Sequence, residues 1–317
     1  IIESVSAEDI GKLPDASIGE SIARLPGLTS QRISGRAGYI SVRGFGPDFS
    51  STLLNGRQQT STNDNRGIEF DQYPSEIVSA VNVYKTPSAN LVGQGLVGTI
   101  DIRTVRPLDK SERTLAVGAR GSYADLGKLN SGSDDKGYRL FGTYIDQNDA
   151  GTLGVALSVA YSNESYQTEE FEAWGFATLS RCDGPYGIDV VTGGQDCGGG
   201  RLREIRPEYA ALEGKQVIGG VKPFVTSSKL KRLGVNGTVQ VKPTDNLTLT
   251  IDGFYSDFDD TNIKRGIEIP LAWSGATLSP TGREIQNGQI VGGTFTGVEA
   301  VVNNHNYVRQ AKLYSGG

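Results

Sequence analysis

The feature that most constrains the fold of this chain is a series of segments in which apolar and polar residues alternate. In LGVNGTVQV (233–241) the odd positions are apolar, apart from Gly237, and the even positions are small or polar. LTLTIDGFY (247–255) and LGVALSVAYSNES (153–165) repeat this pattern, and weaker versions lie at 114–125, 137–147 and about 299–314. A period of two indicates strands with one apolar face. From position 113 onward we therefore expect long antiparallel strands.

The connections between these segments alternate in length. Tight turns lie at 148–151 and 243–246, whereas the other joins cover 126–136, 171–231 and 263–298. Short turns at one end and long loops at the other are typical of an outer-membrane barrel, and a structureless loop of about 60 residues is uncommon in a compact soluble domain. We therefore predict transmembrane β-barrel strands with the long loops outside the cell. The alternative is a soluble β-sandwich or adhesin.

The first hundred residues follow a different pattern. Asp15 is a candidate N-cap, Ile18, Ile22 and Leu25 share one helical face, and Pro26-Gly27 is a stop signal, which together predict one short helix. Short strands are expected in YISVRGFG, STLLNGR and GTIDIRTV, and Pro74 opens a helical turn before a strand at 81–85. This region is predicted to be a small mixed α/β unit that ends near Arg106-Pro107.

The segment LVGQGLVGTIDIRT (91–104) contains Gly93, Gly95 and Gly98 at the spacing of a dinucleotide-binding fingerprint. That fingerprint needs a helix after its glycines, because the helix N-terminus binds the pyrophosphate. Alternating β-branched residues at 99–105 predict a strand instead. The glycines are therefore expected to allow a close approach of two backbones in a tight loop.

Composition excludes several classes of function. The formal net charge is −5, which gives no electrostatic footprint for nucleic acid. The chain has two cysteines and one histidine, so a metal site lacks ligands. Cys182 and Cys197 lie in a Gly-rich loop and are expected to form a local disulfide in an oxidising compartment, with two free thiols as the alternative. Strand parity places this loop on the extracellular side.

Three ordered motifs resemble one known family. LPDASIGESIARLPGL, ISVRGFGPDFSSTLLNGR and PSEIVSAVNVYKTPSANLVGQGLVGTIDIRTVRPL are similar to successive motifs of the plug domain of TonB-dependent outer-membrane receptors, and the strands after them resemble the start of that family's barrel. The resemblance implies a plug domain over residues 1–108. Residues 109–317 would then form about six strands of a 22-stranded antiparallel transmembrane β-barrel, too few to close.

The resemblance also implies the activity. The chain would be a fragment of a receptor in the outer membrane of a Gram-negative bacterium, bound by membrane lipid, that imports a solute too large for porins. The TonB–ExbB–ExbD complex would supply the energy through a TonB box that is not visible in this chain. No covalent chemistry and no cofactor are expected. RLPGL, VRGFGPDF and VYKTPSANLVGQG resemble a carbohydrate-uptake branch, which favours an oligosaccharide. A siderophore, haem or cobalamin receptor and a secreted β-rich binding protein are the alternatives.

The candidate site residues fall into two sets. By the resemblance, Arg43 in VRGF and Lys85 in VYKTP would pair with barrel glutamates, with solvated cations as the alternative. In the polar segment 57–67 and the longest loop, the candidate solute contacts are Gln58, Gln59, Asn63, Asp64, Asn65, Arg66 and Trp174, with Trp273 as a second aromatic that could stack on a sugar. The alternative is a solvated loop with aromatics of the membrane interface belt. The pairs Asp134-Asp135 and Asp259-Asp260 lack calcium-loop spacing and are expected at solvated strand ends.

Overall fold

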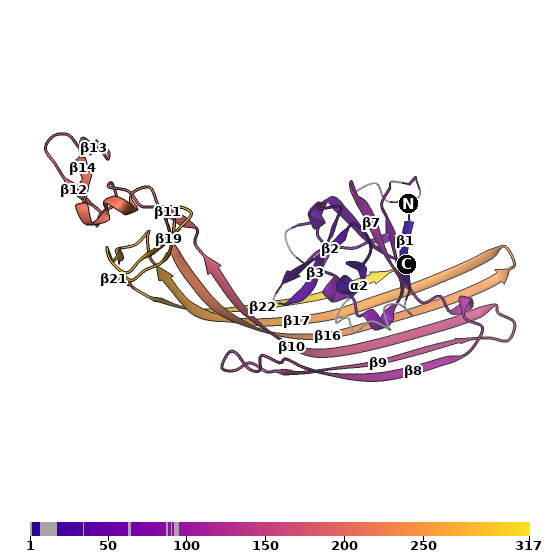
Figure 1. Cartoon of the computed structure of the whole chain (residues 1–317). Helices are drawn as coiled ribbons and strands as arrows, with labels where there is room; N and C mark the ends of the chain where they lie inside the picture. The colour runs from indigo at the N-terminus through magenta and orange to yellow at the C-terminus, as the bar shows by residue number, and fades with distance from the viewer. Residues whose placement is uncertain are drawn as a thin grey trace. The chain divides into compact units, whose positions relative to one another are not determined.

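The computed structural model describes residues 2–6, 18–33, 35–62, 65–86, 88–89, 91 and 95–317 (Figure 1). The chain divides into two compact units. The first unit holds Ile1–Thr168, Ser227–Ile263 and Asn306–Gly317, and the second holds Glu169–Thr226 and Lys264–His305. Among the described residues, no helix has the length and apolar character needed to cross a bilayer.

The N-terminal part of the first unit is a small mixed sheet with short helices. Its five strands lie in the order β1 (Ile2–Ser6), β6 (Val78–Tyr84), β7 (Gly98–Thr104), β4 (Ser50–Leu54) and β5 (Arg57–Gln58), with β4 and β7 parallel. Between β1 and β4 in the sequence, β2 (Leu28–Ile33) and β3 (Arg36–Val42) pair as an antiparallel hairpin. The helices are α2 (Ile18–Ile22) and the 3-10 turns η1 (Pro47–Phe49), η2 (Phe70–Gln72), η3 (Ser75–Ile77) and η4 (Pro107–Asp109).

The predicted local elements of this region are present. Ile18 and Ile22 of α2 are fully buried, as their helical spacing predicts, whereas the candidate cap Asp15 lies outside the described residues. The helix is shorter than predicted: it ends at Ile22, so Leu25 lies in the turn that follows and packs against the core from there. Pro74 precedes the single turn η3, and β6 follows it directly. Burial of alternate residues of β6 and β7 against α2 and η2 builds one apolar core, which also takes in Phe254 and Ala160 from later strands.

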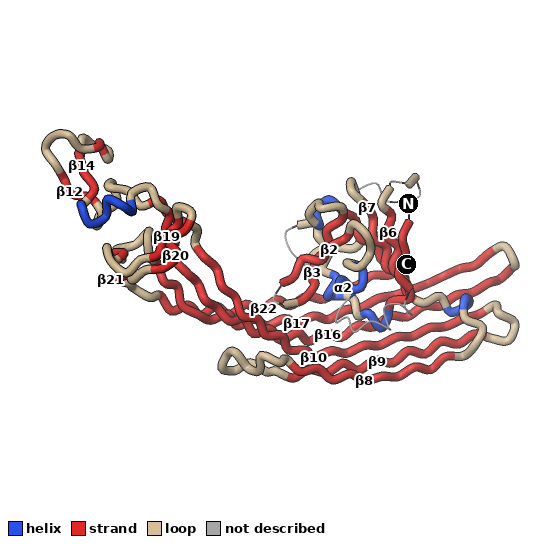
Figure 2. The backbone as a smooth tube through the Cα atoms, in the orientation of Figure 1, coloured by secondary structure: helices blue, strands red, loops and turns tan. Residues whose placement is uncertain are grey.

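The six long strands, most of whose residues belong to the first unit, form one sheet (Figure 2). Their order follows the chain: β8 (Thr114–Tyr123), β9 (Lys136–Gln147), β10 (Leu153–Ala173), β16 (Gly220–Thr244), β17 (Leu247–Pro270) and β22 (Val301–Gly316). A strand therefore lies at each of the six predicted places. Three strands are longer than predicted, because they extend into the long connections. β10 continues to Ala173, β16 begins already at Gly220, and β17 continues to Pro270.

The two faces of this sheet differ in chemistry. The face that contacts the N-terminal region, called here the inward face, buries Ser158, Asn236, Thr238, Asp252 and Ser256. The opposite, outward face exposes the apolar residues at 153–161, 233–241 and 247–255, and each of these runs is nine residues long. A tilted transmembrane strand needs about 9–11 residues. Polar residues inside and apolar residues outside are the reverse of a soluble sheet, so this pattern favours a membrane barrel over a sandwich.

The second unit gives structure to two segments predicted only as long loops. Short strands β11 (Phe176–Thr178), β15 (Gln216–Ile218), β20 (Gln289–Gly292) and β19 (Glu284–Gln286) form one sheet, and β12 (Gly187–Asp189), β14 (Leu202–Ile205) and β13 (Gln195–Asp196) form another. A further pair joins β18 (Thr277–Leu278) to β21 (Phe295–Thr296), and η5 spans Pro207–Leu212. Leu179, Tyr186, Leu212 and Leu278 lie in a separate apolar core.

The glycine segment before β7 serves close packing of backbones. A Cβ on Gly95 would lie 2.3 Å from the carbonyl oxygen of Gly98, and one on Gly98 would lie 3.0 Å from that of Tyr84. Gly98 begins the strand β7, and no helix follows it. The structural interpretation of these two glycines is therefore confirmed, while Gly93 lies outside the described residues.

Candidate functional site

The N-terminal region is joined to the inward face of the sheet by buried ion pairs, and the first is centred on Arg36 at the start of β3. Its guanidinium donates to both carboxylate oxygens of Asp260 in β17, at 2.6 and 3.1 Å, and to Ser228 Oγ in β16 at 2.8 Å. Asp71 of η2 lies 3.4 Å away, and Arg309 of β22 lies within 3.6 Å of both carboxylates. Two arginines and two aspartates are therefore shared between four elements.

A second buried cluster is centred on Arg139 of β9. Its side chain donates two hydrogen bonds to Glu164 of β10, at 2.7 and 2.5 Å, and its Nη1 lies 3.7 Å from Glu76 of η3. Tyr166 donates to Glu164, and its ring packs under the guanidinium of Arg36. Both clusters line one small cavity together with Arg232, which donates to the backbone oxygen of Asp71.

A third cluster is centred on Asp252 of β17. Its carboxylate accepts hydrogen bonds from Arg57 of β5 and from Asn55 Nδ2 at 3.1 Å, and Arg106 lies 3.6 Å away. Nearby, in the N-terminal sheet, burial raises the pKa of Asp101, which accepts a hydrogen bond from the backbone of Gly56 and pairs with Arg103 at 2.5 Å.

These clusters join the two parts of the unit through charged hydrogen bonds and ion pairs, in addition to the apolar core that the two parts share. Breaking a buried pair by removing one partner costs about 3–5 kcal/mol. Such an interface is strong while every partner is present, and its polar groups can be hydrated when it opens.

The candidate solute contacts in 57–67 differ in their exposure to solvent. Gln58, Asn65 and Arg66 are exposed, whereas Gln59 is buried, and Asn63 and Asp64 lie outside the described residues. The amide of Gln59 donates to the backbone oxygen of Arg57 at 2.9 Å and to Ser315 Oγ at 3.3 Å, and accepts from Tyr73 at 3.2 Å. Because its side chain is engaged on three sides, Gln59 holds this segment against β22 instead of facing a solute.

Arg43 and Lys85, the two cations predicted to pair with barrel glutamates, lie in different surroundings. Arg43 is exposed, has a φ of 55°, and forms no side-chain ion pair among the described residues. Lys85 is buried, pairs with Glu3 of β1 at 2.7 Å and donates to the backbone oxygen of Pro26. The cations of the N-terminal region that pair with the long strands, within the part of the chain that the structure describes, are Arg36, Arg57 and Arg106. Pairing of Arg43 or Lys85 with barrel glutamates stays a prediction.

The two tryptophans of the second unit rest on adjacent glycines. A Cβ on Gly220 would lie 3.0 Å from the ring of Trp174, and one on Gly219 would lie 2.5 Å from that of Trp273. Trp174 is half-buried, with Lys222 Nζ 5.2 Å from its ring centroid, whereas Trp273 is 57% exposed. Trp273 is thus the aromatic with more open surface.

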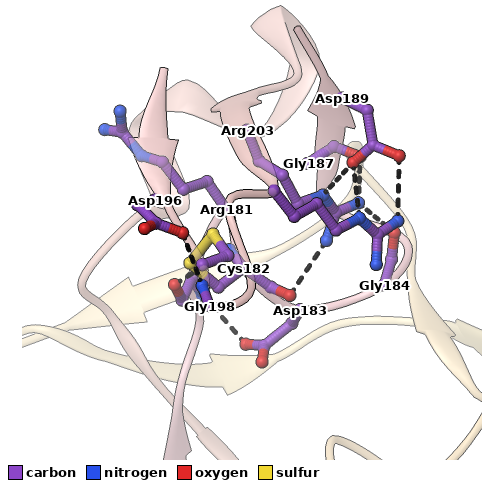
Figure 3. The surroundings of a disulfide bond; sticks show 12 residues. Arg181, Cys182, Asp183, Gly184, Gly187, Asp189, Asp196, Gly198 and Arg203 are labelled. Carbon is purple, nitrogen blue, oxygen red and sulfur yellow. Dashed lines mark hydrogen bonds and ion pairs between the residues drawn. A yellow bond between two sulfur atoms is a disulfide. The ribbon is translucent and has the colours of Figure 1, made fainter.

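Cys182 and Cys197 are joined by a disulfide, with their Cα atoms 5.3 Å apart (Figure 3). Beside it, the buried Arg203 donates to three backbone oxygens, those of Cys182, Gly184 and Gly187, and pairs with Asp189 at 3.1 Å. The loop is therefore fixed by one covalent link and one arginine. No group of three or more His, Cys, Asp or Glu side chains suited to a metal occurs in the described part of the chain.

Sequence reasoning missed the interface residues. Asp260 was expected at a solvated strand end, but its carboxylate is buried against Arg36. A sequence signal for the burial of Asp260 does exist. The even positions of β17 from Asp252 to Asp260 form one series with a period of two, which places Asp260 on the same face as the buried Asp252 and Phe254. Nothing in the local sequence marks Arg36 as its partner, because 224 positions separate them.

Comparison with known proteins places this geometry in context. Residues 1–100 match the TonB-dependent Receptor Plug Domain. The ferric enterobactin receptor PirA of Pseudomonas aeruginosa is 32% identical over 133 residues, which cover 37% of this chain and 18% of that protein. The probable TonB-dependent siderophore receptor PirA of Acinetobacter baumannii is 27% identical over 193 residues, covering 50% of this chain and 24% of the relative.

A solved structure also aligns with most of this chain. The crystal structure of the siderophore receptor PirA from Acinetobacter baumannii aligns with a TM-score of 0.43 at 15% identity, over 84% of this chain and 47% of that one. The chain matches less than a quarter of the length of the two curated relatives.

Proposed function

Because the chain belongs to the TonB-dependent receptors of the Gram-negative outer membrane, we propose that it forms the plug and first barrel strands of a receptor that imports a ferric siderophore. The observation that carries the transport role is the sheet with nine-residue apolar runs outside and a folded plug bound to its polar inside. A polar-lined barrel with a plug is a gated path for a bulky solute. Enzymatic chemistry plays no part, as the relatives are receptors.

The division into a plug at 1–108 and barrel strands from 109 is part of this proposal. The last strand of the plug sheet, β7, ends at Thr104, and the first strand of the six-stranded sheet, β8, begins at Thr114. Between them η4 packs beside β9, and the backbone of Leu108 donates to Gln240 of β16. The segment 105–113 is thus the linker.

The siderophore is favoured by the names of the relatives, which are receptors for ferric enterobactin and related iron carriers. These relatives do not support the oligosaccharide that the motif wording suggested. Within the proposal, the exposed side chains of Gln58, Asn65 and Arg66 and the ring of Trp174 remain the candidate contacts, while Gln59 has a structural role.

Energy would come from the TonB–ExbB–ExbD complex acting on the plug. The interface described above supports this role, because its buried groups are paired by charged hydrogen bonds that water can replace. Transport then requires these bonds to break in sequence or together, and their removal should ease opening of the plug.

Uptake by the complete receptor tests the proposal. Cells that express the full-length protein should accumulate radioactive iron from ferric enterobactin, and deletion of TonB should abolish accumulation. A parallel experiment with a labelled maltooligosaccharide distinguishes the solutes. Oligosaccharide uptake without iron uptake would reject the siderophore and keep the receptor, whereas TonB-independent uptake of either solute would reject energised transport.

A further inference from the structure

A turn of the plug at residues 43–49 lies at the end of the plug sheet that is away from the linker. It contains η1, which directly precedes β4, and β4 runs parallel to β7. Beyond the other end of β4, Asn55 donates to Asp252 near the start of β17, just after the tight turn at 243–246. Tight turns of outer-membrane barrels are periplasmic. The turn around η1 is therefore at the end of β4 that is away from the periplasm.

This turn, called here the aromatic turn, exposes two rings. Phe45 and Phe49 are 51% and 47% exposed, and their ring centroids lie 5.8 Å apart in an edge-to-face arrangement. A second segment, residues 65–67, exposes the side chains of Asn65 and Arg66. Arg66 forms no ion pair within the described residues, so its guanidinium is available to a ligand.

Asp48 of η1 joins the segment 65–67 to the aromatic turn. Its Oδ1 accepts hydrogen bonds from the backbone N–H groups of Arg66 and Gly67, both at 3.0 Å. The two backbones also pack closely, because a Cβ on Gly67 would lie 3.0 Å from Cβ of Pro47 and 3.4 Å from the ring of Tyr39. Hydrogen bonds from backbone N–H groups to a carboxylate are short and strong. Asp48 therefore fixes where the backbone of Arg66 lies relative to the two exposed rings.

The buried Glu69 fixes the chain before this segment. Its carboxylate accepts from the backbone and the hydroxyl of Thr62, at 3.2 and 2.9 Å, and from Ser61 Oγ at 3.2 Å. Gln72 Nε2 and the hydroxyl of Tyr39 donate to the same carboxylate, at 2.9 and 3.3 Å. Glu69 is thus part of the plug interior, whereas Asp48 is exposed. The contact made by Asp48 can therefore be removed without opening the core.

We propose that Asp48 is a positioning residue for solute recognition, which holds Arg66 beside the aromatic turn before the solute arrives. The inference rests on the proposed function, because Arg66 is one of its candidate solute contacts. A guanidinium next to two exposed rings suits an anionic ligand that carries aromatic groups, which is the chemistry of a ferric catecholate. Asp48 acts as a hydrogen-bond acceptor for the backbone, and its negative charge is not what the solute recognises.

Binding of ferric enterobactin by the full-length receptor in detergent tests the proposal with two variants. Asp48→Ala removes the acceptor, so the backbone of Arg66 and Gly67 must be ordered when the solute binds. Ordering the backbone of one residue weakens binding by about 5- to 30-fold, and we expect the dissociation constant to rise by at least that factor. Asp48→Asn keeps a carbonyl oxygen in place of Oδ1. It should therefore bind like the wild type.

Asp109→Ala is the matched control. Asp109 is also an exposed acidic residue of a 3-10 turn that begins with proline, but its side chain makes no hydrogen bond or ion pair within the part of the chain that is described. Its replacement should leave binding unchanged. Because both aspartates lie on the surface, the thermal midpoint of unfolding should stay at the wild-type value in all three variants. Weaker binding at an unchanged midpoint separates positioning from a general loss of stability.

Hydrogen exchange of the Arg66 and Gly67 amides, measured without solute, completes the test. Exchange should be faster in Asp48→Ala than in the wild type, Asp48→Asn and Asp109→Ala. Unchanged exchange in Asp48→Ala would overturn the proposal, and so would wild-type affinity of that variant. Equal weakening by Asp48→Asn and Asp48→Ala would also overturn it, since charge would then be what matters. A wild-type receptor that binds no ferric enterobactin rejects the proposed solute instead, and the exchange of these two amides then decides the role of Asp48.

Discussion

Arg36 connects the plug to β16 and β17 through one guanidinium group. Its replacement by alanine leaves Asp71 and Asp260 buried with Arg309 as their remaining close cation. We expect Arg36→Ala to lower the free energy of unfolding of the full-length receptor by about 3–5 kcal/mol. Chemical denaturation in detergent, followed by proteolysis of the released plug, measures this loss.

The control for Arg36 is Arg32, on the neighbouring strand of the same hairpin. Arg32 pairs with Glu20 at 3.0 Å, but its side chain is largely exposed. An exposed pair contributes at most about 1 kcal/mol, so Arg32→Ala should change stability little. Equal effects of the two substitutions would show that burial of the Arg36 network is not what holds the plug.

The backbone around Gly95 leaves no room for a side chain. The added methyl group of Gly95→Ala would meet the backbone of Gly98 and of Ser51, neither of which can rotate away. Crowding of this kind costs about 1–3 kcal/mol. Gly46→Ala is the matched control, because nothing lies within 4 Å of its Cβ position and its φ is −61°. Thermal unfolding of both variants should show a lower midpoint for Gly95→Ala only.

At the level of elements, the disulfide loop is the part of the second unit with a covalent closure. In the chain-entropy view, a link that closes about 15 residues stabilises by about 3 kcal/mol. The double variant Cys182→Ser, Cys197→Ser should therefore increase hydrogen exchange in 177–217 while leaving the plug sheet protected. Unchanged exchange in the loop would mean that Arg203 and the apolar core fix it without the disulfide.

The same unit should depend on pH through a partly buried ion pair between Arg181 and Glu213. The hydrogen bonds from Arg181, at 2.5 and 2.7 Å, lower the pKa of Glu213 below its usual 4.5. A lowered pKa stabilises the folded state above the unfolded value, and this contribution is lost as the pH falls through the folded value. Exchange near Glu213 should therefore rise as the pH drops below about 4.5.

Glu213→Gln is the control for this pH effect. Its neutral amide cannot titrate, so the low-pH rise in exchange around Arg181 and position 213 should disappear. A rise of the same size in the variant would assign the effect to other carboxylates, such as Asp189, whose pKa is lowered by its hydrogen bond with Arg201.

At the scale of the whole molecule, the outward apolar runs define what the receptor presents to lipid. Leu157 is the central residue of the run at 153–161 and is half-exposed. An arginine at the midplane of a barrel strand costs about 2–4 kcal/mol. Leu157→Arg should therefore reduce folding into liposomes by that amount, whereas Glu169→Arg, at an exposed position of β10 beyond the apolar run, should insert normally. Normal insertion of Leu157→Arg would argue against a membrane barrel.

Much of this architecture could be predicted from short-range patterns. The period of two located all six long strands, and the helical spacing of Ile18 and Ile22 located α2, because both depend on neighbouring residues. Strand lengths were less predictable. Beyond residues 161 and 255, and before residue 233, the alternation of apolar and polar residues in β10, β17 and β16 is interrupted, so these parts of the strands resembled loops.

The sequence by itself determined the plug motifs, the membrane-spanning runs and the need for glycine at 95 and 98, since each is set by local geometry or by solvent. Only the tertiary structure decided which charges meet. Arg36 and Asp260, or Arg57 and Asp252, are polar residues far apart in the chain, and their burial depends on how the plug docks. The burial of Gln59 arises in the same way, from contacts with Tyr73 and Ser315 that no local pattern encodes.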